Sequence, residues 1–279
     1  MRTDIHVAFI GLDGWGSYDL EQSLAHMPHV RAYAKDGIYT DNKKAVLPTI
    51  SAPNWASMFM GAHPDVHGFV QNTKKPSISY TFDVKNNIFP TISQLVRNEG
   101  PTSNIGLFCQ WGGLLYLVDR KSIDYVFHIP RIFPFSHKIL TDKAIKYVKE
   151  TKPVLCTIVY DDLDHKGHKN GYFSDKYFLG LESLDASIER IIEAYKEAGI
   201  YEDTVFILTS DHGGNYKTHG FDSLKELKTP FVMWGKGVNH IGYVGGEMEQ
   251  KDVAIIMATI LDVKTPELWS GNSHLNYFK

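Results

Sequence analysis

Acidic and imidazole side chains recur at three separate places along the 279-residue chain. They are Asp13, Asp164, His168, Asp211, His212 and His219. Carboxylate oxygens and imidazole nitrogens are the ligands that zinc prefers, with manganese or iron as weaker candidates. A single aspartate after a strand is more often a turn former or a helix cap. The recurrence of the same two residue types at three places instead favours a metal site.

A candidate nucleophile is Ser51, in the stretch Pro48-Thr-Ile-Ser-Ala-Pro-Asn54. Because proline is tolerated only in the first turn of a helix, Pro53 predicts that a helix begins near Ser51. The hydroxyl would then lie at the positive end of the helix dipole, where an adjacent metal could lower its pKa. Asn54 would share this helical face and could donate to a phosphoryl oxygen. The alternative is that Ser51 only caps the helix.

Four short apolar runs are predicted to be buried strands, at residues 6–11, 104–109, 154–160 and 204–209. Segments with helical periodicity separate them, and the clearest predicted helices cover residues 175–198 and 252–261. This alternation is typical of an α/β fold with a mainly parallel sheet. Three of the runs end at the acidic and imidazole groups, and ligands of such sheets bind beyond the carboxyl ends of the strands. We therefore expect these groups to meet, at a high electrostatic cost unless cations neutralise them.

Taken together, six motifs resemble the alkaline phosphatase superfamily, and within it the nucleotide pyrophosphatase/phosphodiesterase branch. They run in the same order from about residue 6 to residue 220: Gly11-x-Asp13-Gly, Pro48-Thr-x-Ser51-x-Pro-Asn54, Gly61-x-x-Pro64-x-x-His67-Gly68, Asp164-x-x-Gly-His168, Ser210-Asp211-His212-Gly-Gly and His219-Gly. The resemblance implies a three-layer α/β/α fold with a small cap or loop insertion.

The resemblance also implies two zinc ions about 4 Å apart, the spacing of a two-metal phosphoryl-transfer site. One would be held by Asp164, His168 and His219, and the other by Asp13, Asp211, His212 and the oxygen of Ser51. Ser51 would attack phosphorus in line and form a covalent phospho-enzyme, which water would then hydrolyse. Asn54 would hold a nonbridging oxygen. His67 would have a structural role.

The leading expectation is a hydrolase of phosphodiester or nucleotide pyrophosphate bonds. Family members of that kind usually carry threonine as nucleophile, so Ser51 keeps a phosphomonoesterase open as an alternative. A monoester carries one more negative charge, which a site usually meets with arginine or lysine. The positions of Arg97, Arg120 and Arg131 cannot be derived from the sequence. A non-catalytic metal-binding relic is a third alternative, whereas a sulfatase is disfavoured because the frame after Ser51 lacks its arginine.

The composition sets limits on the partners. A formal net charge of −3 provides no global field for binding nucleic-acid polymers, so a small phosphate ester, such as a nucleotide, is the expected partner. No run approaches the roughly 18 apolar residues of a membrane span, and we expect a soluble protein without a membrane partner. It would be cytoplasmic if the chain is complete, and secreted or periplasmic if a leader was removed. The oligomeric state stays open.

The remaining expectations concern organisation. Residues 1–279 are expected to form a single catalytic α/β domain, in which the polar stretch 69–90 is either a small cap or a plain surface loop. Cys109 and Cys156 lie in apolar contexts and should be buried free thiols. Trp111 could line the cleft and stack on a base, although packing is the stronger interpretation.

Overall fold

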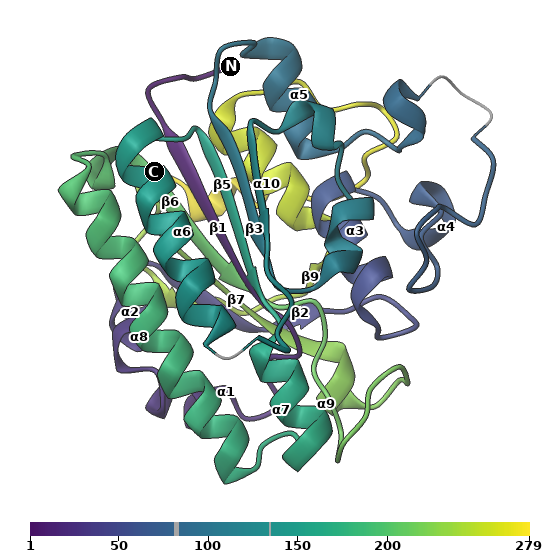
Figure 1. Ribbon diagram of the computed structural model, residues 1–279, viewed down its shortest axis with the longest axis vertical. Coiled ribbons are helices and arrows are strands. Elements are labelled where there is room, and N and C mark those ends of the chain that lie inside the picture. Colours follow the sequence, from purple (N-terminus) through teal and green to yellow (C-terminus); the bar gives the residue numbers. More distant parts are fainter. Residues whose placement is uncertain (81–83, 134) are drawn as a thin grey trace.

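The computed structural model describes residues 1–80, 84–133 and 135–279. Its central feature is one twisted sheet with the strand order β4-β3-β5-β1-β6-β7-β2-β8, and β9 also pairs with β2 (Figure 1). The strands are β1 His6–Leu12, β2 Ile38–Lys44, β3 Ile105–Cys109, β4 Tyr125–His128, β5 Leu155–Tyr160, β6 Thr204–Thr209, β7 Lys228–Gly235, β8 Gly242–Tyr243 and β9 Met248–Glu249. Strands β4, β3, β5, β1 and β6 are mutually parallel, while β7 runs antiparallel to both β6 and β2. The mainly parallel sheet predicted from the sequence is confirmed.

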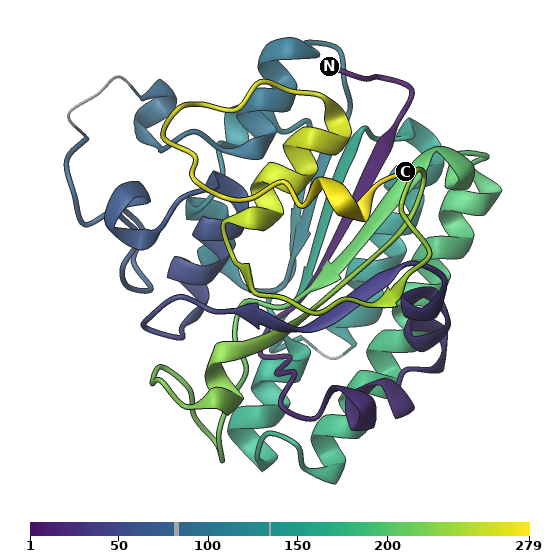
Figure 2. The ribbon, with the colours of Figure 1, turned by 180° about the vertical axis from the view of Figure 1, so that it is seen from behind.

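Helices cover both faces of the sheet. The α-helices are α1 Leu20–Ala25, α2 Pro28–Asp36, α3 Ser51–Met60, α4 Pro64–His67, α5 Ile92–Glu99, α6 Ser136–Thr151, α7 Asp162–Asn170, α8 Asp175–Glu197, α9 Leu224–Leu227 and α10 Asp252–Leu261. Short 3-10 turns are η1 Lys85–Asn87, η2 Gly112–Tyr116, η3 Arg120–Ser122, η4 Tyr201–Asp203 and η5 Leu275–Tyr277. Helices α3, α5 and α10 pack on one face, whereas α1, α2, α6, α7 and α8 pack on the other (Figures 1 and 2). The expected three-layer α/β/α arrangement is confirmed.

The continuous apolar runs have a simple cause. In β1, Val7 and Phe9 join the hydrophobic core beneath α3, while Ala8, Ile10 and Leu12 join the core beneath α8. Because a parallel strand is buried on both faces, it carries no polar alternation. The four predicted strands match β1, β3, β5 and β6 to within one residue at either end, and the two predicted helices match α8 and α10. Both cysteines are buried free thiols, as predicted.

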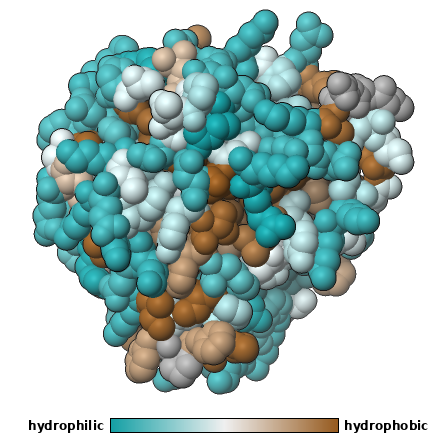
Figure 3. Space-filling model, turned by 45° about the horizontal axis from the view of Figure 1, so that its top comes forward, coloured by the Kyte–Doolittle hydropathy of each residue, from teal (hydrophilic) through white to brown (hydrophobic). Residues whose placement is uncertain are grey.

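Strand β2 was missed because its sequence, Ile-Tyr-Thr-Asp-Asn-Lys-Lys, lacks an apolar run. It lies between β7 and the short strands β8 and β9, where Lys43 points inward and is fully buried. No helix in the part of the chain that the structure describes is long and apolar enough to cross a membrane. On the face shown in Figure 3 the surface is mainly hydrophilic, with hydrophobic residues gathered near its centre and along its lower edge.

The stretch 69–90 falls partly outside the described residues, because residues 81–83 are not among them. Its residues 69–80 form no helix or strand. Described residues of this stretch line one side of a hollow of about 990 Å³, and the other side comes from residues between 115 and 121 and from Val126. None of the expected metal ligands lines this hollow.

Candidate active site

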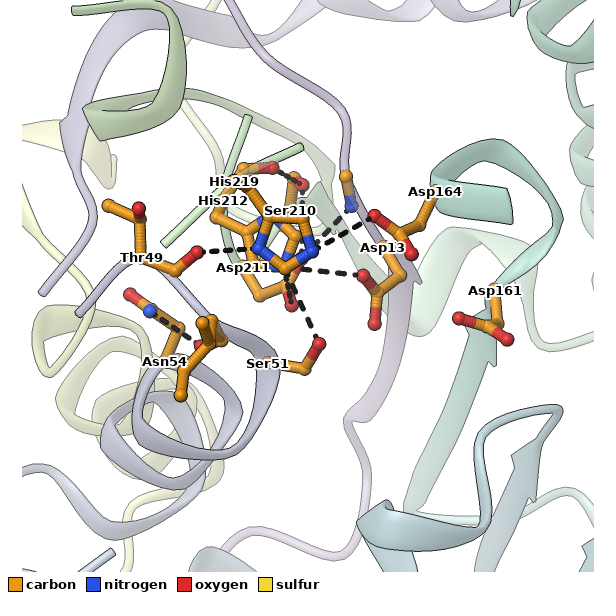
Figure 4. A network of polar contacts seen from close by, with 12 residues as sticks. Asp13, Thr49, Ser51, Asn54, Asp161, Asp164, Ser210, Asp211, His212 and His219 are labelled. Atoms are coloured by element: carbon orange, nitrogen blue, oxygen red, sulfur yellow. Dashed lines mark hydrogen bonds and ion pairs between the residues drawn. The ribbon is translucent and has the colours of Figure 1, made fainter. Parts of the chain in front are cut away.

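The three strands that end in acidic residues are direct neighbours in the sheet. Strand β1 lies between β5 and β6, with Leu12 paired to Tyr160 and Gly11 paired to Thr209. Because all three strands are parallel and in register, the residues that follow them emerge at the same edge. Figure 4 shows the resulting cluster, in which Asp13, Asp164, His212 and His219 surround one centre beside Ser51.

One group of potential ligands consists of Asp164, His168 and His219. One ligand atom from each lies within 4.8 Å of the others. The Nε2 atom of His168 is 3.3 Å from one oxygen of Asp164, and Nε2 of His219 is 3.6 Å from the other oxygen. The two Nε2 atoms are 3.1 Å apart. Helix α7 supplies Asp164 and His168 one turn apart, so both side chains lie on the same helical face.

A second group consists of Asp13, Asp211 and His212, and all three are fully buried. The Nε2 atom of His212 is 3.6 Å from Oδ1 of Asp13 and 3.3 Å from Oδ2 of Asp211. The hydroxyl oxygen of Ser51 lies 3.4 Å from the same Nε2. The structure thus brings all six expected ligands, and Ser51, to one place.

The imidazole rings are oriented by backbone carbonyls. The Nδ1 atoms lie 2.9 Å from the Lys217 oxygen in His168, 2.9 Å from the Gly213 oxygen in His212, and 2.8 Å from the Thr49 oxygen in His219. A carbonyl can only accept, so each Nδ1 must carry the proton and donate it. Each Nε2 of a neutral ring then presents its lone pair to the centre, as a metal ligand must.

The carboxylates show the same pattern of one anchored and one open oxygen. Asp13 accepts a hydrogen bond from the Trp55 indole at 3.1 Å, and Asp211 accepts one from the Gly14 backbone at 3.1 Å. Their other oxygens, Oδ1 of Asp13 and Oδ2 of Asp211, are buried and lack a hydrogen-bond partner among the described residues. Buried unpaired carboxylate oxygens are costly, and a cation between them would remove that cost. The residues therefore fit a bound metal.

Electrostatics point the same way. Burial, followed by the charges of Asp211 and Asp164, raises the pKa of Asp13 well above its usual range. Burial also raises the pKa of Asp211 to about 7. The pKa of His219 falls to about 4, chiefly because burial disfavours the charged ring, and burial likewise lowers the pKa of His212. His212 and His219 are thus neutral, and Asp13 and Asp211 need positive charge to ionise. His168 differs, because its hydrogen bond to Asp164 raises its pKa to about 9, so a metal ion would have to displace a proton from it.

Gly14 allows the loop that carries Asp13 to approach helix α7, which carries Asp164. Its φ of +76° lies in the left-handed region, and a Cβ atom there would come within 2.9 Å of the backbone and side chain of Asp164. The Tyr177 hydroxyl, from α8, donates to the Gly14 carbonyl at 2.9 Å. Glycine is therefore required after Asp13 for the two groups of ligands to share a site.

Ser51 is the first residue of α3 and is 8% exposed. The predicted helix start is therefore observed, with Ile50 rather than Ser51 in the capping position. The next backbone N–H, of Ala52, donates to Oδ1 of the exposed Asn72 at 2.8 Å. Because that N–H can only donate, the amide oxygen of Asn72 must face it. The amino group is then left without a protein partner in the described ranges, next to Ser51.

The role expected for Asn54 needs correction. Its side chain is fully buried and turns away from the cluster (Figure 4). The amino group donates to the carbonyls of Val46, Pro48 and Ile50, and the oxygen accepts from the Val46 N–H at 2.7 Å. All of its capacity is used in holding the loop before α3, so it has no donor for a phosphoryl oxygen.

The two asparagines should therefore respond differently to alanine substitution. We expect Asn72→Ala to lower kcat/KM for a phosphodiester about a hundredfold, because it removes one donor to the reacting phosphoryl group. Its effect on the free energy of unfolding should stay within about 0.5 kcal/mol, since the side chain is exposed. Asn54→Ala should instead destabilise the fold by about 3 kcal/mol, because buried backbone groups lose their partners. Urea unfolding and steady-state kinetics of both variants test this, and the reverse assignment would restore Asn54 as the donor.

A buried network lies behind the loop that carries Asp211. The Nζ atom of Lys43 donates to the Ser210 carbonyl at 2.8 Å and to Oε1 of Gln250. The amide of Gln250 donates in turn to the Asp211 carbonyl and, at 3.3 Å, to Oδ1 of Asn54. These contacts tie the loop that carries Asp211 to the loop before Ser51. No periodic or motif signal in the sequence marks Lys43 or Gln250.

The expectations for Trp111 and His67 concern packing. Trp111 follows β3, is half-buried, and packs against the hydrophobic core on the α3 side of the sheet. Contact with a substrate base therefore stays a prediction. His67 is fully buried and its Nε2 lies 3.0 Å from the Ser57 hydroxyl inside α3, in keeping with a structural role.

Several known proteins resemble this chain. Human ectonucleotide pyrophosphatase/phosphodiesterase family member 1 is 26% identical over 212 residues, which make up 72% of this chain and 23% of that protein. GPI ethanolamine phosphate transferase 1 of Candida glabrata is 22% identical over 282 residues, covering 90% of this chain and 30% of that protein. The chain thus spans less than a third of the length of these two relatives.

The fold also matches a solved structure, that of an inactive form of murine ectonucleotide pyrophosphatase/phosphodiesterase 5 in complex with AMP. The TM-score is 0.80 at 14% identity, over 99% of this chain and all of the other. A family model described as type I phosphodiesterase/nucleotide pyrophosphatase matches residues 7–216. That segment includes Ser51 and every expected ligand except His219. The chain therefore belongs to the type I phosphodiesterase/nucleotide pyrophosphatase family.

Proposed function

We propose that the protein hydrolyses phosphodiester or nucleotide pyrophosphate bonds at a two-zinc site, through a covalent phosphoserine on Ser51. The observation that carries this proposal is the convergence of two groups of ligands on Ser51, whose oxygen is 3.4 Å from Nε2 of His212. Family membership supports the reaction class, and the AMP bound to the murine structure supports a nucleotide as substrate.

Asp164, His168 and His219 would hold one zinc ion, and Asp13, Asp211 and His212 the other. Nitrogen and oxygen ligands in sets of three, each leaving open positions, are typical of catalytic zinc. Manganese or iron would accept similar ligands. When bound, such ions lower the pKa of hydroxyl groups and water and offset the charge on phosphoryl oxygens.

Ser51 has the position that the attacking group needs. It stands at the N-terminus of α3, whose dipole favours an anion. Once its proton is lost to solvent, its oxygen forms a bond to phosphorus while the bond to the leaving group breaks on the opposite side. Water then attacks the phosphoserine, releases the phosphate product and restores the hydroxyl. In both steps the amino group of Asn72 would donate to a nonbridging phosphoryl oxygen.

A phosphomonoesterase stays the second candidate, because Ser51 replaces the threonine usual in diesterases and because a cationic side chain, Arg131, lies near the site. The decisive experiment compares kcat/KM for a 4-nitrophenyl ester of a nucleoside monophosphate with that for 4-nitrophenyl phosphate, using zinc-loaded protein. We expect kcat/KM to be at least about tenfold higher for the diester. A tenfold ratio corresponds to a difference in activation free energy of only about 1.4 kcal/mol. Faster cleavage of the monoester would exchange the two candidates, and cleavage of neither would leave a metal-binding relic.

A further inference from the structure

Arg131 lies beside the candidate active site although it belongs to neither group of ligands. It follows β4, in the connection to α6, and its Nη1 donates to Oδ2 of Asp161. Asp161 follows β5 directly, and its carboxylate lies within 4.8 Å of those of Asp13 and Asp164. Arg131 is therefore held at the edge of the cluster that would bind the metal ions.

In the ion pair between Arg131 and Asp161, the aspartate is buried and held in place, whereas the arginine is partly exposed. The side chain of Asp161 is only 4% exposed, and its backbone N–H donates to Oε1 of Gln110 at 2.8 Å. The side chain of Arg131 is 36% exposed. Neither its Nε nor its Nη2 has a hydrogen-bond partner among the described residues. A guanidinium presents five donors in a fixed plane, so several of them remain available to a ligand.

The charges of the site make the guanidinium more than a partner for Asp161. Two divalent cations would offset the four carboxylates Asp13, Asp161, Asp164 and Asp211. Arg131 would then add one positive charge beyond those that balance these four carboxylates.

We propose that Arg131 determines substrate specificity. It would bind the additional negative charge that a phosphomonoester or a nucleoside polyphosphate carries compared with a simple diester. This inference rests on the proposed phosphoryl chemistry of the adjacent site. The shared ligand chemistry is a pair of phosphate oxygens, which the guanidinium fork fits in a bidentate manner. They belong either to the reacting phosphoryl group or to a second phosphate beside it.

The test compares three substrates on zinc-loaded wild-type protein and on Arg131→Ala. Bis(4-nitrophenyl) phosphate carries one negative charge, 4-nitrophenyl phosphate carries the extra charge on the reacting group, and ATP carries it on neighbouring phosphates. We expect kcat/KM for one or both of the more charged substrates to fall roughly ten- to hundredfold, with a change of less than about threefold for the diester. A loss with the monoester alone identifies the reacting group, and a loss with ATP alone identifies the second phosphate. Equal changes for all three substrates overturn the proposal.

Matched variants separate recognition from structure. Arg131→Lys keeps the charge without the planar fork and should recover part of the selectivity. Arg190→Ala removes an ion-paired arginine on the outer surface, where Arg190 contacts Asp142 at 2.6 Å, and should leave all three rates unchanged. If Arg131→Ala fails to fold because Asp161 is left buried and unpaired, the double variant Arg131→Ala/Asp161→Asn removes both charges.

A binding measurement keeps this proposal distinct from the proposed hydrolysis. If the wild-type protein cleaves none of the substrates, the hydrolase proposal fails by itself. Calorimetry with inorganic phosphate on zinc-loaded Ser51→Ala protein still tests Arg131, since it needs no turnover. There, Arg131→Ala should weaken phosphate binding about tenfold, and an unchanged affinity would refute the role of Arg131.

Discussion

Ser51→Ala protein is expected to keep its two metal equivalents and to lose at least about a thousandfold in kcat, because the attacking atom is gone while the ligand groups are intact. The six residues proposed as ligands lie outside α3, and among them Ser51 has a hydrogen-bond contact with His212. Metal analysis by mass spectrometry and steady-state turnover of a nitrophenyl diester are the two measurements. A burst of nitrophenol, matched to one phosphate bound per wild-type chain, would identify the covalent intermediate.

Two controls sharpen this expectation. Asp211→Asn and His212→Ala should each lose activity together with one metal equivalent, whereas Ser51→Ala loses only activity. Ser51→Thr retains a hydroxyl and should keep more of the activity than the alanine variant does. If Ser51→Ala still hydrolysed diesters at nearly the wild-type rate, water rather than the serine would be the attacking group.

Removal of the metal ions is expected to reverse the contribution of the buried carboxyl groups to the pH dependence of stability. In the metal-free protein, burial raises the pKa values of Asp211 and Asp161 to about 7 each, against an unfolded value near 3.8. Between about pH 4 and pH 7 these two carboxyl groups stay protonated in the folded state but not in the unfolded chain, so their contribution to the free energy of unfolding falls as the pH rises. The lowered pKa values of His219 and His212 contribute in the opposite direction below about pH 6.5. Metal binding requires deprotonated ligands, so the stability of the loaded protein should rise over the same range.

Thermal unfolding from pH 5 to pH 8, with zinc and after treatment with a chelator, measures both slopes. Chelation should also abolish turnover, because no other group in the described site supplies comparable positive charge. Asp211→Asn offers a matched control, since an amide does not titrate. Losing the falling contribution of Asp211 should make the slope of the metal-free protein more positive, and an unchanged slope would refute proton binding by Asp211.

The sequence was informative where chemistry and periodicity coincided. The runs that became β1, β5 and β6 are apolar because both faces of a parallel strand are buried, and each ends in a residue type that has few other reasons to recur there. Predicting that these residues meet did not require the order of the strands, since all strands of a parallel sheet have their carboxyl ends at the same edge. Pro53, which is tolerated only in the first turn of a helix, placed Ser51 at a helix start.

The errors concern contacts that no periodicity or motif in the sequence reveals. Helical spacing put Asn54 near Ser51, but it could not show that the loop from Val46 to Ile50 folds back and consumes the amide group. Asn72 lies in a polar stretch without periodicity, and only the folded chain places it on Ala52. Arg131 and Lys43 were equally out of reach, because each acts through a partner more than 25 residues away.

The position of β1 has a consequence for how the protein is made. The strand is formed by residues 6–12 but pairs with residues 155–160 and 204–209. A growing chain on the ribosome therefore holds this hydrophobic segment without its first partner strand until residue 160, and without its second until residue 209, has been synthesised. Such sequence-distant pairing slows folding and exposes the segment to aggregation, so early chaperone contact should protect it. Because Asp13, Asp164 and Asp211 follow these three strands, the two groups of candidate metal ligands can come together only when the strands have paired, late in the folding of the chain.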